Sequence, residues 1–192
     1  PSTFYVYQQV YDNNGNPIQN AVVDRDGNGE ITESDKYLTG KSPMAKVFMG
    51  FSSQFTYKNW DLGFNMRANF GNYVFNGFAA DNTSLNNFAN QGFATNYYKD
   101  AGKYGFTQIS DIIQKSTDLY LENASFLKMD NITLGYSFNK FFTSRISGRI
   151  SASVQNVFTI TKYTGLDPEC DAIDSNVWPR PRSFTIGLNL NF

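Results

Sequence analysis

The chain has 192 residues, a formal net charge of −1, one cysteine and no histidine. The near-zero charge offers no basic surface for nucleic acid, and the lack of histidine excludes Ser-His-Asp, Cys-His and His-ligated zinc chemistry within the chain. With Cys170 alone, neither an internal disulfide nor a cysteine metal cluster can form. No stretch comes near 18 consecutive apolar residues, so the sequence predicts no transmembrane helix.

Alternation of apolar and polar residues predicts six β-strands, because successive side chains of a strand point to opposite faces. In chain order the predicted strands cover residues 3–11, 46–57, 60–70, 125–138, 145–157 and 184–192. In the last strand Phe184, Ile186 and Leu188 alternate with Thr185 and Gly187 without a break. A strand of this kind either packs on a core or shows its apolar face to lipid and its polar face to a wet lumen.

The fourth predicted strand changes phase in its middle. Ile132 and Leu134 share a face in its second half, but Leu127 and Met129 fall on the opposite phase in its first half. The break predicts a β-bulge near Asp130, or a strand end that projects beyond the membrane.

The connections alternate strictly between long and short: residues 12–45, 58–59, 71–124, 139–144 and 158–181. This pattern is typical of outer-membrane barrels, which have short periplasmic turns and long external loops, and it predicts a periplasmic C-terminus. An aromatic girdle is expected near the short turns, at Tyr57, Trp60, Phe138, Phe141, Phe142 and Phe192. Six strands cannot close a barrel, so we expect this chain, which starts at Pro1 without a signal peptide, to be the tail of a longer protein.

Residues 24–35 (DRDGNGEITESD) fit a calcium-binding loop. Asp24, Asp26 and Asn28 would supply oxygen ligands, Glu30 its backbone carbonyl, and Asp35 would replace the usual bidentate glutamate, which predicts modest affinity. The other interpretation is a turn rich in Asx and glycine residues that needs no metal. If calcium binds, its role is expected to be structural.

Two further regions are candidate sites. The acidic segment around Cys170 has no spacing that fixes a catalytic geometry, and no acid–base chemistry is expected there; its acids are Asp167, Glu169, Asp171 and Asp174. A second segment interleaves amides and aromatics that suit either sugar binding or packing against a partner, and both remain open; its members are Asn82, Asn86, Asn87, Asn90, Asn96, Phe78, Phe88, Phe93, Tyr97 and Tyr98.

Four blocks together resemble the C-terminal part of the SusC/RagA family of TonB-linked outer-membrane transporters. They are residues 24–35 followed by Gly40 and Pro43, residues 123–136 (NASFLKMDNITLGY), residues 155–169 (QNVFTITKYTGLDPE) and residues 181–192 (PRSFTIGLNLNF). The aromatic end of the last block, with Gly187 five positions earlier, also resembles the signal read by the bacterial barrel-assembly machinery.

The resemblance implies an all-β chain of six antiparallel strands that forms the C-terminal portion of a 22-stranded transmembrane barrel. Residues 1–192 would supply wall and external loops, without catalysing a reaction, to an importer of glycans or oligopeptides. Expected partners are the remaining barrel and plug, a SusD-like surface lipoprotein as lid, the TonB complex and outer-membrane lipid. The lumen face would carry Asn65, Arg67, Asn69, Arg149, Ser151, Ser153, Gln155, Thr185, Asn189 and Asn191.

Two other hypotheses remain from the residues themselves. One is a soluble or surface β-sandwich binding module that holds calcium. The other is an outer-membrane enzyme, which the lack of histidine and of any nucleophile–base pair disfavours.

Overall fold

The computed structural model describes residues 3–83, 102–107, 112–141, 146–175 and 178–191. The chain divides into two compact units, each assembled from separate stretches of sequence. The sheet unit comprises Lys46–Phe70, Ser125–Lys162 and Pro179–Phe192. The loop unit comprises Pro1–Ala45, Gly71–Ala124 and Tyr163–Trp178, and thus collects the three connections predicted to be long.

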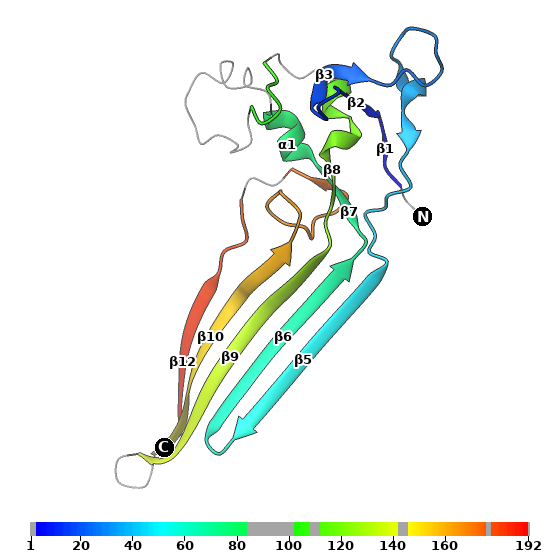
Figure 1. Cartoon of the computed structure of the whole chain (residues 1–192). Helices are drawn as coiled ribbons and strands as arrows, with labels where there is room; N and C mark the ends of the chain where they lie inside the picture. Colours follow the sequence, from blue (N-terminus) through cyan, green and yellow to red (C-terminus); the bar gives the residue numbers. More distant parts are fainter. Residues whose placement is uncertain (1–2, 84–101, 108–111, 142–145, 176–177, 192) are drawn as a thin grey trace. The chain divides into compact units, whose positions relative to one another are not determined.

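The sheet unit is a single antiparallel sheet of five long strands in the order β12-β10-β9-β6-β5, which lie side by side in Figure 1. The strands are β5 (Val47–Tyr57), β6 (Trp60–Phe70), β9 (Phe126–Phe141), β10 (Ile146–Thr161) and β12 (Ser183–Asn191). Five of the six predicted strands are therefore confirmed, with ends that differ by at most four residues. The two-residue turn between β5 and β6 places Lys58 at a φ of 53°.

The bulge predicted near Asp130 is present in β9. Asn65 of β6 pairs with Asn131 whereas the next residue, Met66, pairs with Met129, so Asp130 has no partner in the register. The extra residue reverses the side-chain phase, which puts Leu127 and Met129 back on the same face as the apolar half of the strand.

A second bulge lies in β10, where the pairing with β9 jumps from Gln155 to Phe158. Asn156 takes a left-handed φ of 54° there, a conformation that asparagine tolerates better than most residues. Its side-chain amide donates to the carbonyl of Arg180 at 2.9 Å, and the Arg182 Nε donates back to the Asn156 carbonyl at 3.3 Å. Asn156 in the bulge therefore holds the segment that leads into β12.

The register gives the sheet two chemically distinct faces. One row of cross-strand partners runs through all five strands as Phe55, Leu62, Leu134, Ala152 and Ile186. The next row, on the opposite face, runs as Thr56, Asp61, Gly135, Ser151 and Gly187. The alternation predicted for single strands thus adds up to a continuous apolar face and a continuous polar face.

The first predicted strand does not join this sheet, and its assignment to a row of six strands is wrong. Residues 3–11 contain β1 (Tyr5–Val6), which pairs with β4 (Tyr37–Leu38), and β2 (Gln9–Tyr11), which pairs with β3 (Pro17–Val22). The buried Gln9 amide donates to the carbonyls of Ile18 at 2.7 Å and Ala21 at 3.1 Å. The local hairpin of β2 and β3 thus supplies the hydrogen-bond acceptors of the Gln9 amide. Strand propensity indicates that residues 3–11 are extended, but it does not indicate which strand they pair with.

The rest of the loop unit holds a three-stranded sheet in the order β11-β7-β8, formed by β11 (Ile173–Asp174), β7 (Tyr73–Asn76) and β8 (Leu121–Asn123). Short helices accompany it: α1 (Gly77–Asn82), α3 (Ile112–Lys115), η1 (Glu33–Asp35) and η2 (Asp118–Tyr120). The Asn76 side chain caps α1 by accepting from the Ala79 N–H at 2.9 Å. Among the residues that the structure describes, no helix is long and apolar enough to cross a membrane.

Candidate functional site

The polar face of the sheet carries an ion pair that spans three strands. The Arg149 guanidinium on β10 donates to both carboxylate oxygens of Asp61 on β6, at 3.0 and 2.5 Å. Gly135 on β9 lies between them, and a Cβ at this position would clash with both charged groups. Glycine at position 135 therefore leaves room for the pair to cross β9 in this geometry. The predicted lumen face included Arg149 but not Asp61 or Gly135, which only the strand register brings together.

Two further interactions tie the same face together. The Arg67 Nε lies 2.7 Å from the Asp130 carboxylate, so the bulge in β9 also supplies an ion-pair partner for β6. The Asn65 amide donates to the Asn131 side chain at 3.0 Å and is hydrogen-bonded to the Ser52 hydroxyl. Neighbouring strands are therefore joined by side chains as well as by the backbone ladder, and the surface remains rich in donors and acceptors.

The opposite face is apolar and uncovered. Phe55, Leu188 and Ile186 expose 57%, 64% and 81% of their surface. A β-sandwich would bury this face under a second sheet. Among the described residues, the sheet unit contains one sheet, and no second sheet packs on its apolar face. Near the turn, Trp60 packs against Tyr136 with ring centroids 4.7 Å apart. Of the other expected girdle positions, Phe142, Phe192 and the side chain of Phe141 lie outside the described residues.

The predicted metal residues lie in one turn of the loop unit. Asp24, Asp26 and Asp35 bring one carboxylate oxygen each to within 4.8 Å of the others. The Asp24 carboxylate accepts the N–H groups of Gly27 at 2.7 Å and Gly29 at 2.8 Å, and both glycines have a positive φ that this tight turn requires. The turn thus brings three carboxylates close to one another.

Two of the predicted ligands, Asn28 and Asp35, also hold the turn through hydrogen bonds of their own. The Asn28 side chain donates to Asp26 at 3.0 Å and accepts the Glu30 N–H at 2.7 Å, which makes it a brace of the turn. The fully buried Asp35 accepts the N–H groups of Arg25 at 2.7 Å and Thr32 at 2.8 Å. Hydrogen bonds from backbone N–H groups, with that of Thr32 first, lower the pKa of Asp35 below its usual value.

The acidic segment around Cys170 is structural. Asp174 is buried and accepts a hydrogen bond from the Tyr163 hydroxyl at 2.8 Å, while the Asp167 carboxylate accepts the Glu169 N–H at 3.0 Å. Burial, with the nearby Asp174 as the next cause, raises the pKa of the Cys170 thiol to about 12. These hydrogen bonds hold the segment around Cys170 to its neighbours in the loop unit. In the amide- and aromatic-rich segment, the predicted residues from Asn86 to Tyr98 lie outside the described residues.

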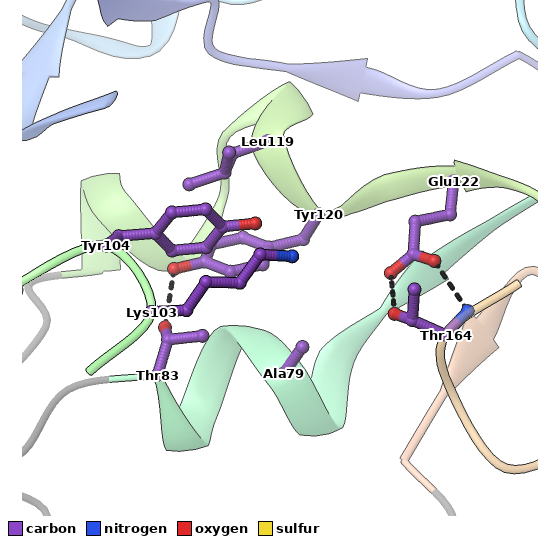
Figure 2. A pocket seen from close by; sticks show the side chains of 8 residues that line it. All are labelled: Ala79, Thr83, Lys103, Tyr104, Leu119, Tyr120, Glu122 and Thr164. Atoms are coloured by element: carbon purple, nitrogen blue, oxygen red, sulfur yellow. Dashed lines mark hydrogen bonds between the residues drawn. The ribbon is translucent and has the colours of Figure 1, made fainter. Parts of the chain in front are cut away.

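Sequence reasoning missed a cavity of about 230 Å³ in the loop unit, shown in Figure 2. Its lining comes from α1, the turn after residue 101, η2, β8 and the segment after β10, namely Ala79, Thr83, Lys103, Tyr104, Leu119, Tyr120, Glu122 and Thr164. Because these residues are scattered over 86 positions of the chain, no local motif could reveal it.

Hydrogen bonds hold the cavity wall in place. At one end the hydroxyls of Thr83 and Tyr120, both buried, lie 2.8 Å apart. At the other end the Glu122 carboxylate accepts from the Thr164 hydroxyl at 2.7 Å and from the Thr164 N–H at 2.8 Å. The Asn76 amide that caps α1 also donates to Glu122 at 2.9 Å. These hydrogen bonds therefore fix the wall side chains relative to one another.

Several curated proteins are similar to this chain in sequence. The TonB-dependent receptor SusC of Bacteroides thetaiotaomicron is 44% identical over 199 aligned positions, which cover 100% of this chain and 19% of that receptor. The TonB-dependent receptor P3 of Formosa agariphila is 28% identical over 88% of this chain and 18% of its own length. The chain thus spans about a fifth of the length of these curated relatives. No protein-family model matches the chain.

Solved structures agree in fold. The RagAB peptide transporter superposes with a TM-score of 0.69 at 23% identity, covering 100% of this chain and 23% of the transporter chain. The open-open state of the RagAB peptide importer gives a TM-score of 0.67 at 21% identity, with 22% of its chain covered. The strands match an all-β fragment of a TonB-dependent barrel. By its sequence and its fold, the chain is therefore similar to the SusC/RagA-type TonB-dependent receptors and is consistent with their C-terminal part.

Proposed function

We propose that this chain forms part of the wall and the outer loops of an outer-membrane TonB-dependent importer of oligomeric nutrients, either glycans or oligopeptides. The observation that carries the proposal is the 44% identity to SusC along the whole chain. The name of that relative supports coupling to TonB, and the RagAB peptide transporter supports an importing role for the shared fold.

The two faces of the sheet support the same assignment physically. The uncovered apolar face suits lipid, whereas the face with Arg149, Asp61 and Arg67 suits a hydrated lumen. Both outer strands of the sheet, β5 and β12, have a free edge in the described chain, and free edges are not tolerated in lipid. The remaining strands of the barrel would close these edges.

The further partners follow from this assignment. A SusD-like surface lipoprotein would cap the barrel as a lid, the plug would fill the lumen, and the TonB complex would act from the periplasm. The short turn between β5 and β6 would face the periplasm, together with the C-terminus, and the loop unit would lie outside the cell.

The test uses native membranes. After detergent extraction, unboiled and boiled samples are run side by side on a gel, and peptides of this chain are traced by mass spectrometry. We expect a heat-modifiable band of about 100 kDa or more, because this 21.7-kDa chain covers 19% of SusC, together with a co-purifying lipoprotein. Peptides found only in a soluble band of about 22 kDa, unchanged by boiling, would refute the importer.

We also infer that the acidic turn binds calcium in a structural role. The convergence of the Asp24, Asp26 and Asp35 carboxylates within 4.8 Å supports it, since hard oxygen ligands are those that calcium prefers. Bound calcium would neutralise the mutual repulsion of these carboxylates and hold the turn that leads into β4.

Chelation tests the calcium proposal on the intact, purified transporter. Adding calcium after EGTA treatment should raise the thermal unfolding midpoint of the wild type but not of Asp26→Asn. Glu33→Gln is the matched control, because Glu33 is an exposed acid of the same loop that pairs with Lys36 outside the cluster. An equal response of wild type and Asp26→Asn would contradict a metal at this turn.

A further inference from the structure

The alternation of β12 does not by itself specify its register on β10, the strand beside it in Figure 1. In the structure Ser151 of β10 pairs with Gly187 of β12. A slip by two residues would instead place Thr185 or Asn189 opposite Ser151. Every apolar residue of β12 would still lie on the apolar face, because side chains repeat along a strand with a period of two. The hydrophobic pattern therefore excludes a slip by one residue but permits a slip by two.

The other strands of the sheet have further means of fixing their register. Short connections join β5 to β6 and β9 to β10, and the length of a hairpin connection sets its register. The Arg67–Asp130 ion pair links β6 to β9, and the Arg149–Asp61 pair links β10 to β6. Neither pair reaches β12, which follows the long connection of residues 162–182. The register of β12 therefore depends on contacts of its own.

The bulge of β10 makes such contacts where the chain enters β12. The Asn156 amide donates to the carbonyl of Arg180 at 2.9 Å and to that of Pro181 at 3.3 Å. The Arg182 Nε donates in return to the Asn156 carbonyl at 3.3 Å. These contacts form the Asn156 clamp. They hold three consecutive residues to one residue of β10, immediately before the ladder between the two strands begins at Ser183.

The clamp discriminates between the native register and a slipped one. In a regular antiparallel strand the carbonyl groups of consecutive residues point to opposite edges, so one amide cannot reach both. The carbonyls of Arg180 and Pro181 converge on Asn156 because they lie before the regular strand. A slip by two residues moves β12 by roughly 7 Å, which breaks both carbonyl contacts and takes Arg182 away from Asn156.

We propose that the Asn156 clamp sets the register in which the last strand joins the sheet. Steric fit opposes a slip only mildly, because a Cβ at Gly187 would meet the rotatable Ser151 hydroxyl, with 2.9 Å between Cβ and Oγ. Since β12 is an edge of the described sheet, its register also sets the height at which the next strand pairs with it. In the proposed barrel, an error of two residues would change the shear and prevent proper closure.

Disulfide trapping in the full-length transporter reads the register. Cysteines at Ser153 and Thr185 report the native pairing. Cysteines at Ser151 and Thr185, or at Ser151 and Asn189, report slips in the two directions. Directly opposed residues have Cα atoms about 4.5–5.5 Å apart, whereas these diagonal pairs are about 7–8 Å apart in the native register, beyond the reach of a disulfide. Linked peptides are identified by mass spectrometry in the whole outer-membrane fraction, so chains that fail to close a barrel are counted.

Two substitutions remove the amide from the clamp. Asn156→Gly keeps the left-handed backbone of the bulge, and Asn156→Asp keeps the side-chain shape but replaces the donor by a carboxylate that only accepts. Each should raise the yield of slipped relative to native disulfides about tenfold, the effect of one or two lost hydrogen bonds. Gln155→Glu is the matched control, because it makes the same exchange at an exposed neighbour outside the clamp.

A wild-type disulfide ratio in Asn156→Gly would overturn the proposal, because the bulge would then set the register without the amide. Equal slippage in Gln155→Glu and Asn156→Asp would also overturn it, since added charge would be the cause. If no Asn156 variant reaches the membrane, Arg182→Ala decides the matter, because Arg182 is exposed and contributes one contact of the clamp. Slipped disulfides in Arg182→Ala would then support the clamp, and their absence would overturn it. The heat-modifiable band of the parent protein tests the importer separately.

Discussion

Cys170 illustrates how a single side chain is controlled by its surroundings. The thiol packs against the small cluster of Val74, Ala124 and Tyr163, and the carboxylates of Asp167, Asp171 and Asp174 lie near enough to oppose its ionisation. Burial and these charges raise its pKa from an ordinary 9.0 to about 12. The thiolate, which is the reactive form, is therefore nearly absent at neutral pH.

The raised pKa predicts slow alkylation of the native protein. At pH 9 half of the Cys170 thiols are ionised in the unfolded chain, but only about one in a thousand is ionised at a pKa of about 12. Iodoacetamide labelling of the native transporter, followed by mass spectrometry, should thus be at least about 100-fold slower than labelling in urea. Equal rates in the two states would show that the thiol is neither buried nor opposed by charge.

The same shift fixes the direction of a pH effect on stability. The fold prefers the neutral thiol, because the pKa is higher in the folded state than in the unfolded state. The contribution of Cys170 to stability is therefore complete below about pH 9 and is lost as the pH rises from about 9 toward 12.

At the scale of elements, the strands of the sheet depend on side chains that cross them. The Arg149–Asp61 pair connects β10 to β6 and passes over Gly135 of β9. The Arg67–Asp130 pair and the contact between Asn65 and Asn131 connect β6 to the bulged part of β9. These links fix the register in a sheet whose polar face has no core to fix it.

Gly135→Ala tests the crossing pair. The new methyl group would clash with the guanidinium and the carboxylate, so the pair must separate. Because the clashing atoms are the ends of flexible, partly exposed side chains, the cost should not exceed about 1 kcal/mol, the value of a surface ion pair. Gly50→Ala is the matched control, because Gly50 lies on the same face of β5 and a methyl group there would have no neighbour within 4 Å. The temperature at which the heat-modifiable band is lost should fall for Gly135→Ala only. An equal fall in both variants would assign the effect to the loss of glycine itself.

At the scale of the whole molecule, the chemistry of the two faces of the sheet indicates which environment each face contacts. Leu188 pairs with Ile150 on the apolar face, and its neighbour Asn189 pairs with Arg149 on the polar face. In the proposed barrel, lipid on one side and water on the other would account for both faces of the sheet remaining without a covering layer.

Substitutions at these neighbours test the orientation. Leu188→Arg places a charge toward lipid near mid-strand and should destabilise the barrel by about 2–4 kcal/mol, whereas Asn189→Leu changes only the lumen wall and should cost less. The yield of folded, heat-modifiable transporter in outer membranes measures both effects. Greater damage from Asn189→Leu would reverse the assignment of the two faces.

The sequence by itself determined the long strands, their two faces and the phase change near Asp130, for which a bulge was one of two interpretations, and it carried the resemblance to the family. Each of these depends on a period of two along one stretch of chain, or on blocks of residues in a fixed order. The phase change between Met129 and Ile132 is visible without any partner strand, because a bulge reverses the side-chain alternation of its own strand.

Only the tertiary structure shows which contacts the residues of the long connections make. Gln9 and Gln114 are hydrogen-bonded across 105 positions, and Glu122 and Thr164 across 42, so no local pattern could predict these contacts. The cavity, whose lining includes Glu122 and Thr164, could not be predicted for the same reason. For the same reason the aromatic residues 3–11 predicted a strand of the long sheet, although their partners lie in the loop unit. The crossing of Arg149 over Gly135 likewise requires the register of three strands, and that register is set by pairing between distant segments.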